Sequence, residues 1–169
     1  MDLIAVIQFD AELHRLDFRS AHKAFALLMH LRGLAKEKLL IQTRMTDNYV
    51  LKTAQKMDFG YFYRQELKYR RELNFPPYRH LVAVGLRAAQ EDVVFEQSKT
   101  LYERLTKRGR KTIEISDPYP DVIAKLRGKY RYTILLKGKS VKGILTFVKS
   151  ILKDFKRKRN TIITIDVDP

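Results

Sequence analysis

The strongest constraint on the fold is the order of strand-like and helix-like segments that follows Phe75-Pro76-Pro77. A residue that precedes proline is pushed out of the α region, so a helix before this point has to end there. Beyond it, short apolar or alternating segments predict strands, and apolar residues at spacings of three and four predict amphipathic helices. We expect strands over 80–88, 112–116, 130–137 and 160–167, and helices over 91–108 and from Ser140 onwards.

The resulting order, β-α-β-β-α-β, is typical of the ferredoxin-like fold, in which four antiparallel strands carry two helices on one face. We expect Gly109 to end the first helix in a left-handed conformation and Ser140 to cap the second. The segment Asp117-Pro118-Tyr119-Pro120 is predicted to be a turn. The face of the sheet away from the helices is expected to be open, and an open face is a common place for a ligand to bind.

The residues before the prolines predict a smaller α/β arrangement. Strands are expected over 3–7 and 38–43, and helices over 17–34, 47–57 and 59–73. Asp17 is the expected N-cap of the first of these helices. The predicted fold class is therefore α+β: a C-terminal ferredoxin-like β-α-β-β-α-β domain, preceded by a small α/β segment and a helical stretch.

Positive charge is concentrated in the later part of the chain. The whole sequence of 169 residues has a net charge of +15; residues 1–63 contribute +2 and residues 64–169 contribute +13. A surplus of this size on a small protein favours a polyanionic partner, most commonly nucleic acid and next an anionic membrane. No apolar run approaches the length that spans a bilayer, and no signal segment opens the chain, so we expect a cytoplasmic protein without a membrane partner.

The sequence contains none of the usual signatures of catalysis. It has no cysteine, no phosphate-binding loop and no Gly-x-Gly-x-x-Gly motif. Its four histidines do not stand at metal-binding spacing. Asp10 with Glu12, and Asp166 with Asp168, are expected to share one face of a strand, without a companion base. We therefore predict no catalytic residue, no metal site and no cofactor.

The segment 123–132 carries the clearest binding signal. We expect Lys125, Arg127, Lys129 and Arg131 to contact phosphates, because bound cations release counterions from a nucleic acid. Tyr130 or Tyr132 would stack on bases, Gly128 would permit close backbone approach, and Lys137 and Lys139 would extend the basic edge. The alternative interpretation is that both tyrosines pack on the helices while the cations face water.

A second basic cluster is predicted on the helix over 59–73. Arg64, Lys68 and Arg71 follow each other at spacings of four and three, which places them on one helix face. This face is either a secondary patch for DNA or a solvent-exposed basic surface.

Three sequence segments resemble the family of primosomal protein N′, the replication-restart helicases. They are Glu66 to Tyr78 (ELKYRRELNFPPY), Ile123 to Ser140 (IAKLRGKYRYTILLKGKS) and the terminal Ile165 to Pro169 (IDVDP). The resemblance implies that residues 1–45 are the end of the second helicase lobe, 46–78 a helical linker and 79–169 the C-terminal DNA-binding domain. It implies DNA as partner, branched at a fork or single-stranded, with single-stranded DNA-binding protein and other primosome proteins as further partners.

The chain departs from that family at two motif positions. Asp17-Phe18-Arg19 is kept, but Leu34 and Glu37 stand where the family has arginines. Such arginines neutralise charge on a transferring phosphoryl group. We therefore expect a DNA-binding, nucleoid-associated protein without an ATPase of its own. The alternatives are an RNA-binding or ribosome-associated protein, one piece of a split ATP-dependent helicase, and a remnant without function.

Overall fold

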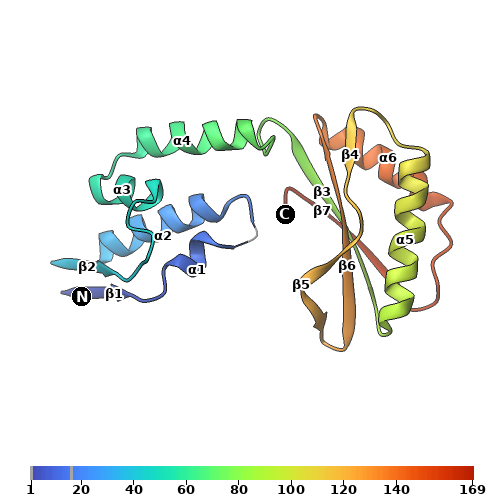
Figure 1. Cartoon of the computed structure of the whole chain (residues 1–169), viewed down its shortest axis with the longest axis horizontal. Coiled ribbons are helices and arrows are strands. Elements are labelled where there is room, and N and C mark those ends of the chain that lie inside the picture. The colour runs from blue at the N-terminus through green and yellow to red at the C-terminus, as the bar shows by residue number, and fades with distance from the viewer. Residues whose placement is uncertain (1, 16) are drawn as a thin grey trace. The chain divides into compact units, whose positions relative to one another are not determined.

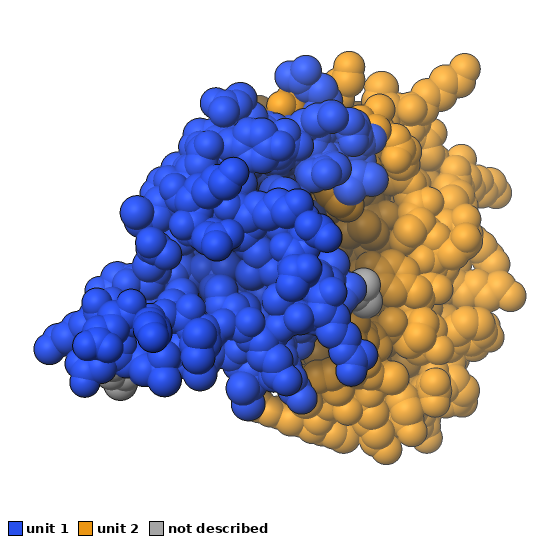
Figure 2. Space-filling model, turned by 60° about the vertical axis from the view of Figure 1, so that its left-hand side comes forward, with its two compact units in different colours: residues 1–73 blue, residues 74–169 orange. Residues whose placement is uncertain are grey.

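The computed structural model describes residues 2–15 and 17–169, which form two compact units. Unit 1 extends to Leu73 and unit 2 comprises Asn74–Pro169 (Figures 1 and 2). The structure assigns an α+β fold, as the sequence predicts. The division of residues 1–78 into a helicase-lobe segment and a linker stays a prediction.

Unit 1 contains two parallel strands and four helices. The elements are β1 (Leu3–Val6), α1 (Asp10–Leu13), α2 (Ser20–Leu34), β2 (Lys38–Ile41), α3 (Tyr49–Lys56) and α4 (Phe59–Glu72). Its core is aromatic at the centre, where the ring of Phe25 stacks on that of Phe62 with 3.9 Å between centroids. Asn48 caps α3 and Asp58 caps α4, because each side chain accepts a hydrogen bond from the first turn.

Two expectations for unit 1 are wrong. Helix α2 begins at Ser20, three residues after Asp17, and the Asp17 carboxylate accepts a hydrogen bond from the backbone N–H of Arg19 instead of capping the helix. Asp10 and Glu12 lie in the short helix α1 and not on a strand. The Asp10 carboxylate binds the hydroxyl of Thr43 and the backbone N–H of Arg44, and so ties α1 to the end of β2. A local sequence pattern does not reveal that Asp10 pairs with Thr43 and Arg44, which lie more than 30 residues further along the chain.

Unit 2 has the ferredoxin-like topology with one added strand. Its elements are β3 (His80–Ala88), α5 (Glu91–Lys107), β4 (Ile113–Ile115), β5 (Tyr119–Leu126), β6 (Lys129–Gly138), α6 (Val141–Lys153) and β7 (Ile162–Val167). The strand order β4-β6-β3-β7, antiparallel throughout, is the one that the predicted β-α-β-β-α-β sequence requires. Figure 1 shows both helices on the same side of this sheet.

The added strand β5 corrects the predicted turn at 117–120. Tyr119 and Pro120 already pair with β6, on the same edge that β4 occupies further along.

The conformation of Gly109 also differs from the prediction. Gly109 does not adopt a left-handed conformation; an added Cβ would meet the carbonyl oxygen of Thr106 at 2.9 Å, so close approach is what requires glycine there. Ser140 caps α6 as predicted, accepting from the N–H of Gly143 at 3.2 Å.

The core of unit 2 lies between the sheet and the two helices. Alternate residues of β3 (Val82, Val84, Leu86) and β6 (Ile134, Leu136) point into it. The C-terminal residues close onto β3: the Asp168 carboxylate accepts from the N–H of Leu81 at 2.8 Å and contacts Nδ1 of His80 at 3.0 Å. The opposite face of the sheet has no helix over it within unit 2, as predicted.

Candidate nucleic-acid interface

The hairpin formed by β5 and β6 holds most of the predicted binding residues. Its loop consists of Arg127 and Gly128 alone, since Leu126 and Lys129 already pair with each other. Both loop residues have positive φ, +50° and +73°, as a two-residue turn that matches the strand twist requires. The predicted importance of Gly128 therefore has a local cause, because glycine adopts such a φ without steric penalty.

The two tyrosines of the hairpin lie on the helix side of the sheet. Tyr130 and Tyr132 are half-buried against the core of unit 2, and the ring of Tyr132 meets that of Phe95 on α5 at 5.6 Å. The amino group of Lys125 lies 4.7 Å from the centroid of Tyr130. This arrangement corresponds to the alternative interpretation, in which both rings support the fold. Base stacking by either tyrosine stays a prediction.

Arg131 lies on the open face, and the structure adds a residue that the sequence analysis did not select. Arg87 of β3 stands directly opposite Arg131, so both guanidinium groups project from the same face. The Nε atom of Arg87 is buried and has no hydrogen-bond partner among the described residues. Like charges directly opposite each other destabilise a sheet, and a buried unpaired donor costs further free energy. The pair is therefore suited to an anion that accepts from both arginines.

One carboxylate partly balances this pair. Asp121 of β5 lies 3.6 Å from Nε of Arg131 and accepts a hydrogen bond from the hydroxyl of Thr133 at 2.5 Å. The same carboxylate, together with burial, raises the pKa of the Tyr119 hydroxyl, burial being the larger cause. Arg87 is left without a described counterion, and the local charge of the face stays positive.

The remaining hairpin cations surround the tip. Lys125 is exposed on the helix side of the sheet, beside Tyr130, and Arg127 is exposed in the turn. Lys129 is half-buried on the same face as Arg131. Together with Arg87 they form what we call the hairpin patch: Arg87, Lys125, Arg127, Lys129 and Arg131. Lysine and arginine gathered around a hairpin tip neutralise phosphates along a nucleic-acid backbone.

Lys137 and Lys139 do not join the hairpin patch. Lys137 stands eight residues along β6 from Lys129, roughly 26 Å at the usual rise per strand residue. Its amino group lies 4.9 Å from the ring centroid of Phe75, beside the ion pair of Arg79 with Glu114. Lys139 is exposed between β6 and α6. Both lysines therefore lie at the end of β6 that is away from the hairpin tip.

The predicted secondary patch lies in unit 1, on α4. Arg64, Lys68 and Arg71 are all exposed, so the helical spacing does place them on a solvent-facing side. Arg70, by contrast, faces inward and binds the buried carboxylate of Glu66 at 2.8 Å. A role of this helix face in DNA binding stays a prediction.

A further basic groove lies at the ends of α5 and α6. Arg104, Lys107 and Arg108 line it, with Ile151 and Asp154 opposite. Arg104 donates to the carbonyl oxygen of Asp154 at 2.9 Å and lies over the ring of Phe155, while Arg108 lies 3.7 Å from the Asp154 carboxylate. Arg104 and Arg108 therefore bind Asp154, the residue that follows α6, and are already engaged within unit 2.

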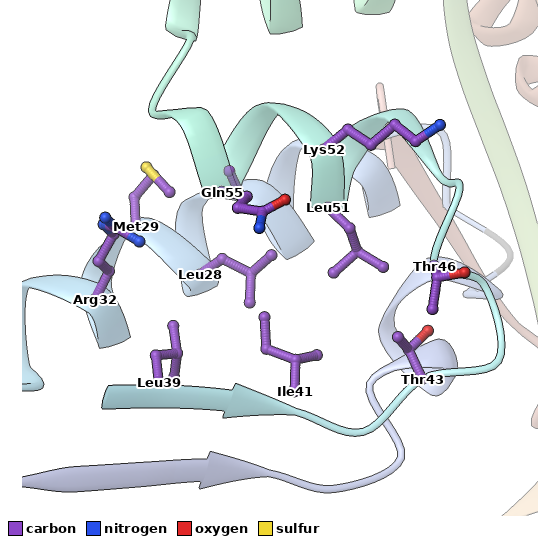
Figure 3. A pocket seen from close by; sticks show the side chains of 11 residues that line it. Leu28, Met29, Arg32, Leu39, Ile41, Thr43, Thr46, Leu51, Lys52 and Gln55 are labelled. Carbon is purple, nitrogen blue, oxygen red and sulfur yellow. The ribbon is translucent and has the colours of Figure 1, made fainter. Parts of the chain in front are cut away.

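A cleft in unit 1 lies between α2, α3 and β2 (Figure 3). The cleft measures about 340 Å³. Four aliphatic side chains point into it, those of Leu28, Leu39, Ile41 and Leu51, while Arg32 and Lys52 lie at its ends.

The described residues contain no cluster of three or more metal-ligating side chains. Among them there is also no helix both long and apolar enough to cross a membrane.

Fold and surface together define a small basic domain of the ferredoxin-like class, which follows a small α/β unit in sequence. Residues 71–169 match the family model of the primosomal protein N C-terminal domain. Because this match covers more than half of the sequence, the chain belongs to that family.

The similarity to relatives extends over nearly the whole chain. The replication restart protein PriA of Bacillus subtilis is 30% identical over 175 residues, which cover 99% of this chain and 22% of that protein. The proteins of the same name from Treponema pallidum and Thermotoga maritima are 30% and 28% identical, over 99% and 89% of this chain. The chain spans only 20–26% of the length of these relatives.

Proposed function

We propose that unit 2 binds DNA through the hairpin patch, as part of a replication-restart system. The single observation that carries this proposal is the opposed pair Arg87 and Arg131, whose charge the described residues do not balance. The exposed cations of the adjacent turn extend the positive surface around this pair. Membership of the primosomal protein N family supports nucleic acid, rather than a membrane, as the polyanion.

Within that function, we expect a preference for forked or single-stranded DNA and no ATP hydrolysis by this chain alone. The second expectation depends on Leu34, which ends α2, and on Glu37, which precedes β2. Neither side chain has the positive charge that stabilises a transferring phosphoryl group. Contact with other primosome proteins, including single-stranded DNA-binding protein, and a place at the nucleoid belong to the same proposal.

Fluorescence anisotropy at several salt concentrations tests the proposal. The ligands are a model fork, a matched single strand, a matched duplex and an RNA of equal length. We expect the fork or the single-stranded DNA to bind most tightly near physiological salt. Preference for the RNA would favour the ribosome-associated alternative, and equal binding to all four would reduce the surface to a generic polycation.

A double variant locates the contact on the protein. Arg127→Ala with Lys129→Ala is expected to weaken binding and to lower the salt slope by about 0.7–0.9 for each lost phosphate contact. The matched control is Arg32→Ala with Lys36→Ala, which removes the same charges from exposed positions of unit 1 outside both predicted patches. An unchanged slope in the hairpin variant removes this turn from the interface.

A further inference from the structure

The two most exposed large apolar side chains of unit 2 are neighbours on β5. Val122 is 83% exposed and Ile123 is 57% exposed. Both are β-branched aliphatic residues, which usually lie inside a protein. They stand in the strand that borders the hairpin patch, only two to three residues before the cation Lys125. Nothing within unit 2 covers them.

An irregular pairing of β5 and β6 puts these side chains outside the sheet. Pro120 pairs with Tyr132 and Lys125 pairs with Tyr130, so the four residues 121–124 stand opposite the single residue Arg131. Extra residues on one strand bend it and re-aim its side chains. We call residues 121–124 the bulge.

The bulge is anchored at both ends. At its start, Asp121 holds the hydroxyl of Thr133 and lies beside Arg131. At its end, Lys125 and Leu126 resume regular pairing with β6. Val122 and Ile123 are therefore presented from fixed points of the backbone, and the entropy cost of ordering them on a ligand is correspondingly small.

The residues around Val122 and Ile123 indicate which ligand these two side chains contact. Cations adjoin the bulge: Arg131 stands opposite it on β6, and Lys125 and Arg127 follow it in sequence. A polyanion held by these cations brings its own apolar parts against Val122 and Ile123. In DNA those parts are the faces of the bases, and proteins insert isoleucine, leucine or phenylalanine between them at unstacked steps.

We propose that Val122 and Ile123 form an apolar wedge that packs against bases exposed where a DNA duplex meets a single strand. The inference rests on the proposed DNA binding and specifies the part of DNA that the site recognises. In an uninterrupted duplex the base faces are covered by stacking, and separating them costs free energy. At a junction one base face is already accessible, so the wedge favours the branch point.

The test uses the full chain and a fork that carries 2-aminopurine at the junction. This base fluoresces more strongly when it is unstacked. We expect the wild-type chain to raise its fluorescence, and the variant Val122→Ser with Ile123→Ser to abolish most of that rise. Fork affinity is expected to fall about tenfold. The salt slope and the affinity for an uninterrupted duplex should stay unchanged, because the phosphate contacts remain.

Two controls separate the wedge from folding and from apolar exposure in general. Thermal melting of the double variant should match that of wild type, since both side chains are exposed. Ile7→Ser removes another exposed aliphatic side chain, 75% exposed in unit 1, and should leave the fluorescence rise intact.

The proposals fail in distinguishable ways. If the wild-type chain binds no DNA, the proposed function is overturned and the wedge with it. If wild type binds the fork and the double serine variant gives the same fluorescence rise, only the wedge is overturned. It is also overturned if fork and duplex affinity fall equally, or if sedimentation shows that wild type self-associates and the variant does not, since the bulge would then be a protein contact.

Discussion

Arg87 and Arg131 face each other directly across β3 and β6, on the side of the sheet that the helices leave uncovered. Their side chains leave the backbone about 5 Å apart, as in any directly opposed antiparallel pair. Asp121 approaches Arg131, and the buried Nε of Arg87 has no described partner. Such an arrangement costs folding free energy, and a phosphate bound by the two guanidinium groups would offset part of that cost.

Replacing Arg87 should therefore weaken binding without weakening the fold. For Arg87→Gln we expect a salt slope lower by about 0.7–0.9, the value for one lost phosphate contact. The free energy of unfolding should stay equal or rise by up to about 1 kcal/mol, because the like-charge pair is removed. Anisotropy and thermal melting of the same preparation check both parts. A clear loss of stability would make Arg87 a structural residue.

Removing the carboxylate that balances Arg131 should have the opposite effect. Asp121→Asn keeps an acceptor for Thr133 but removes one negative charge from the open face. We expect fork affinity at low salt to rise about twofold to fivefold, with the gain shrinking as salt is added. Asp47→Asn, at an exposed carboxylate of unit 1, is the matched control. Equal gains in both variants would indicate net charge rather than this contact.

We expect the substitution of glycine by alanine to have opposite effects on the free energy of unfolding at Gly128, in the hairpin turn, and at Gly33, in a helix. Gly128 has a φ of +73°, where an L residue costs roughly 1–2 kcal/mol, so Gly128→Ala should lower the free energy of unfolding by about that amount. Gly33 lies near the end of helix α2, where an added Cβ would meet no atom within 4 Å, so Gly33→Ala should raise the free energy of unfolding by roughly 0.5–1 kcal/mol. Urea denaturation measures both. Destabilisation of equal size at the two sites would contradict the turn geometry.

A hydroxyl in unit 1 should make stability sensitive to alkaline pH. The Tyr49 hydroxyl donates to the buried Glu66 carboxylate at 2.7 Å, and burial followed by this carboxylate raises the pKa of Tyr49 far above its ordinary value of 10. Because the pKa is raised in the folded state, the contribution is fully present below pH 10 and is lost as the pH rises beyond it.

Tyr49→Phe tests this contact. At neutral pH the variant should lose about 1.5–3 kcal/mol of unfolding free energy, the typical value for a hydrogen bond to a charged group. Above pH 10 the difference from wild type should shrink. Tyr63→Phe, which removes an exposed tyrosine hydroxyl from the same helix as Glu66, should change neither value. A difference that grows with pH would contradict the assignment.

Sequence patterns predicted the regular elements of unit 2 well, because each is encoded locally. The alternation over β3 and β7 and the apolar spacing of α5 and α6 need no distant partner to be recognised. Strand β5 was missed for a physical reason: Pro118 and Pro120 favour a turn, and the strand is held only by its pairing with β6. The capping role expected of Asp17 was wrong because local backbone and lysine contacts compete for its carboxylate.

The grouping of residues in the hairpin patch was predicted in part, and its role in binding stays a prediction. Lys125, Arg127, Lys129 and Arg131 do gather on one hairpin, as a contiguous sequence segment must. Arg87 was not selected because its position opposite Arg131, 44 residues later in the sequence, depends on the register between β3 and β6. The alternation of side chains along the strand predicted correctly that Tyr130 and Tyr132 lie on the same face of the sheet. It does not tell which of the two faces they lie on, because packing against the core and α5 decides that.

The bulge in β5 also separates changes of the protein surface from changes of the core. Regular pairs flank it, Tyr119 with Thr133 on one side and Lys125 with Tyr130 on the other. Residues gained or lost between these pairs leave the register of β6, and with it the hydrophobic core, where they were. Changes within residues 121–124 should therefore alter the exposed surface of the hairpin while the sheet beneath keeps its pairing.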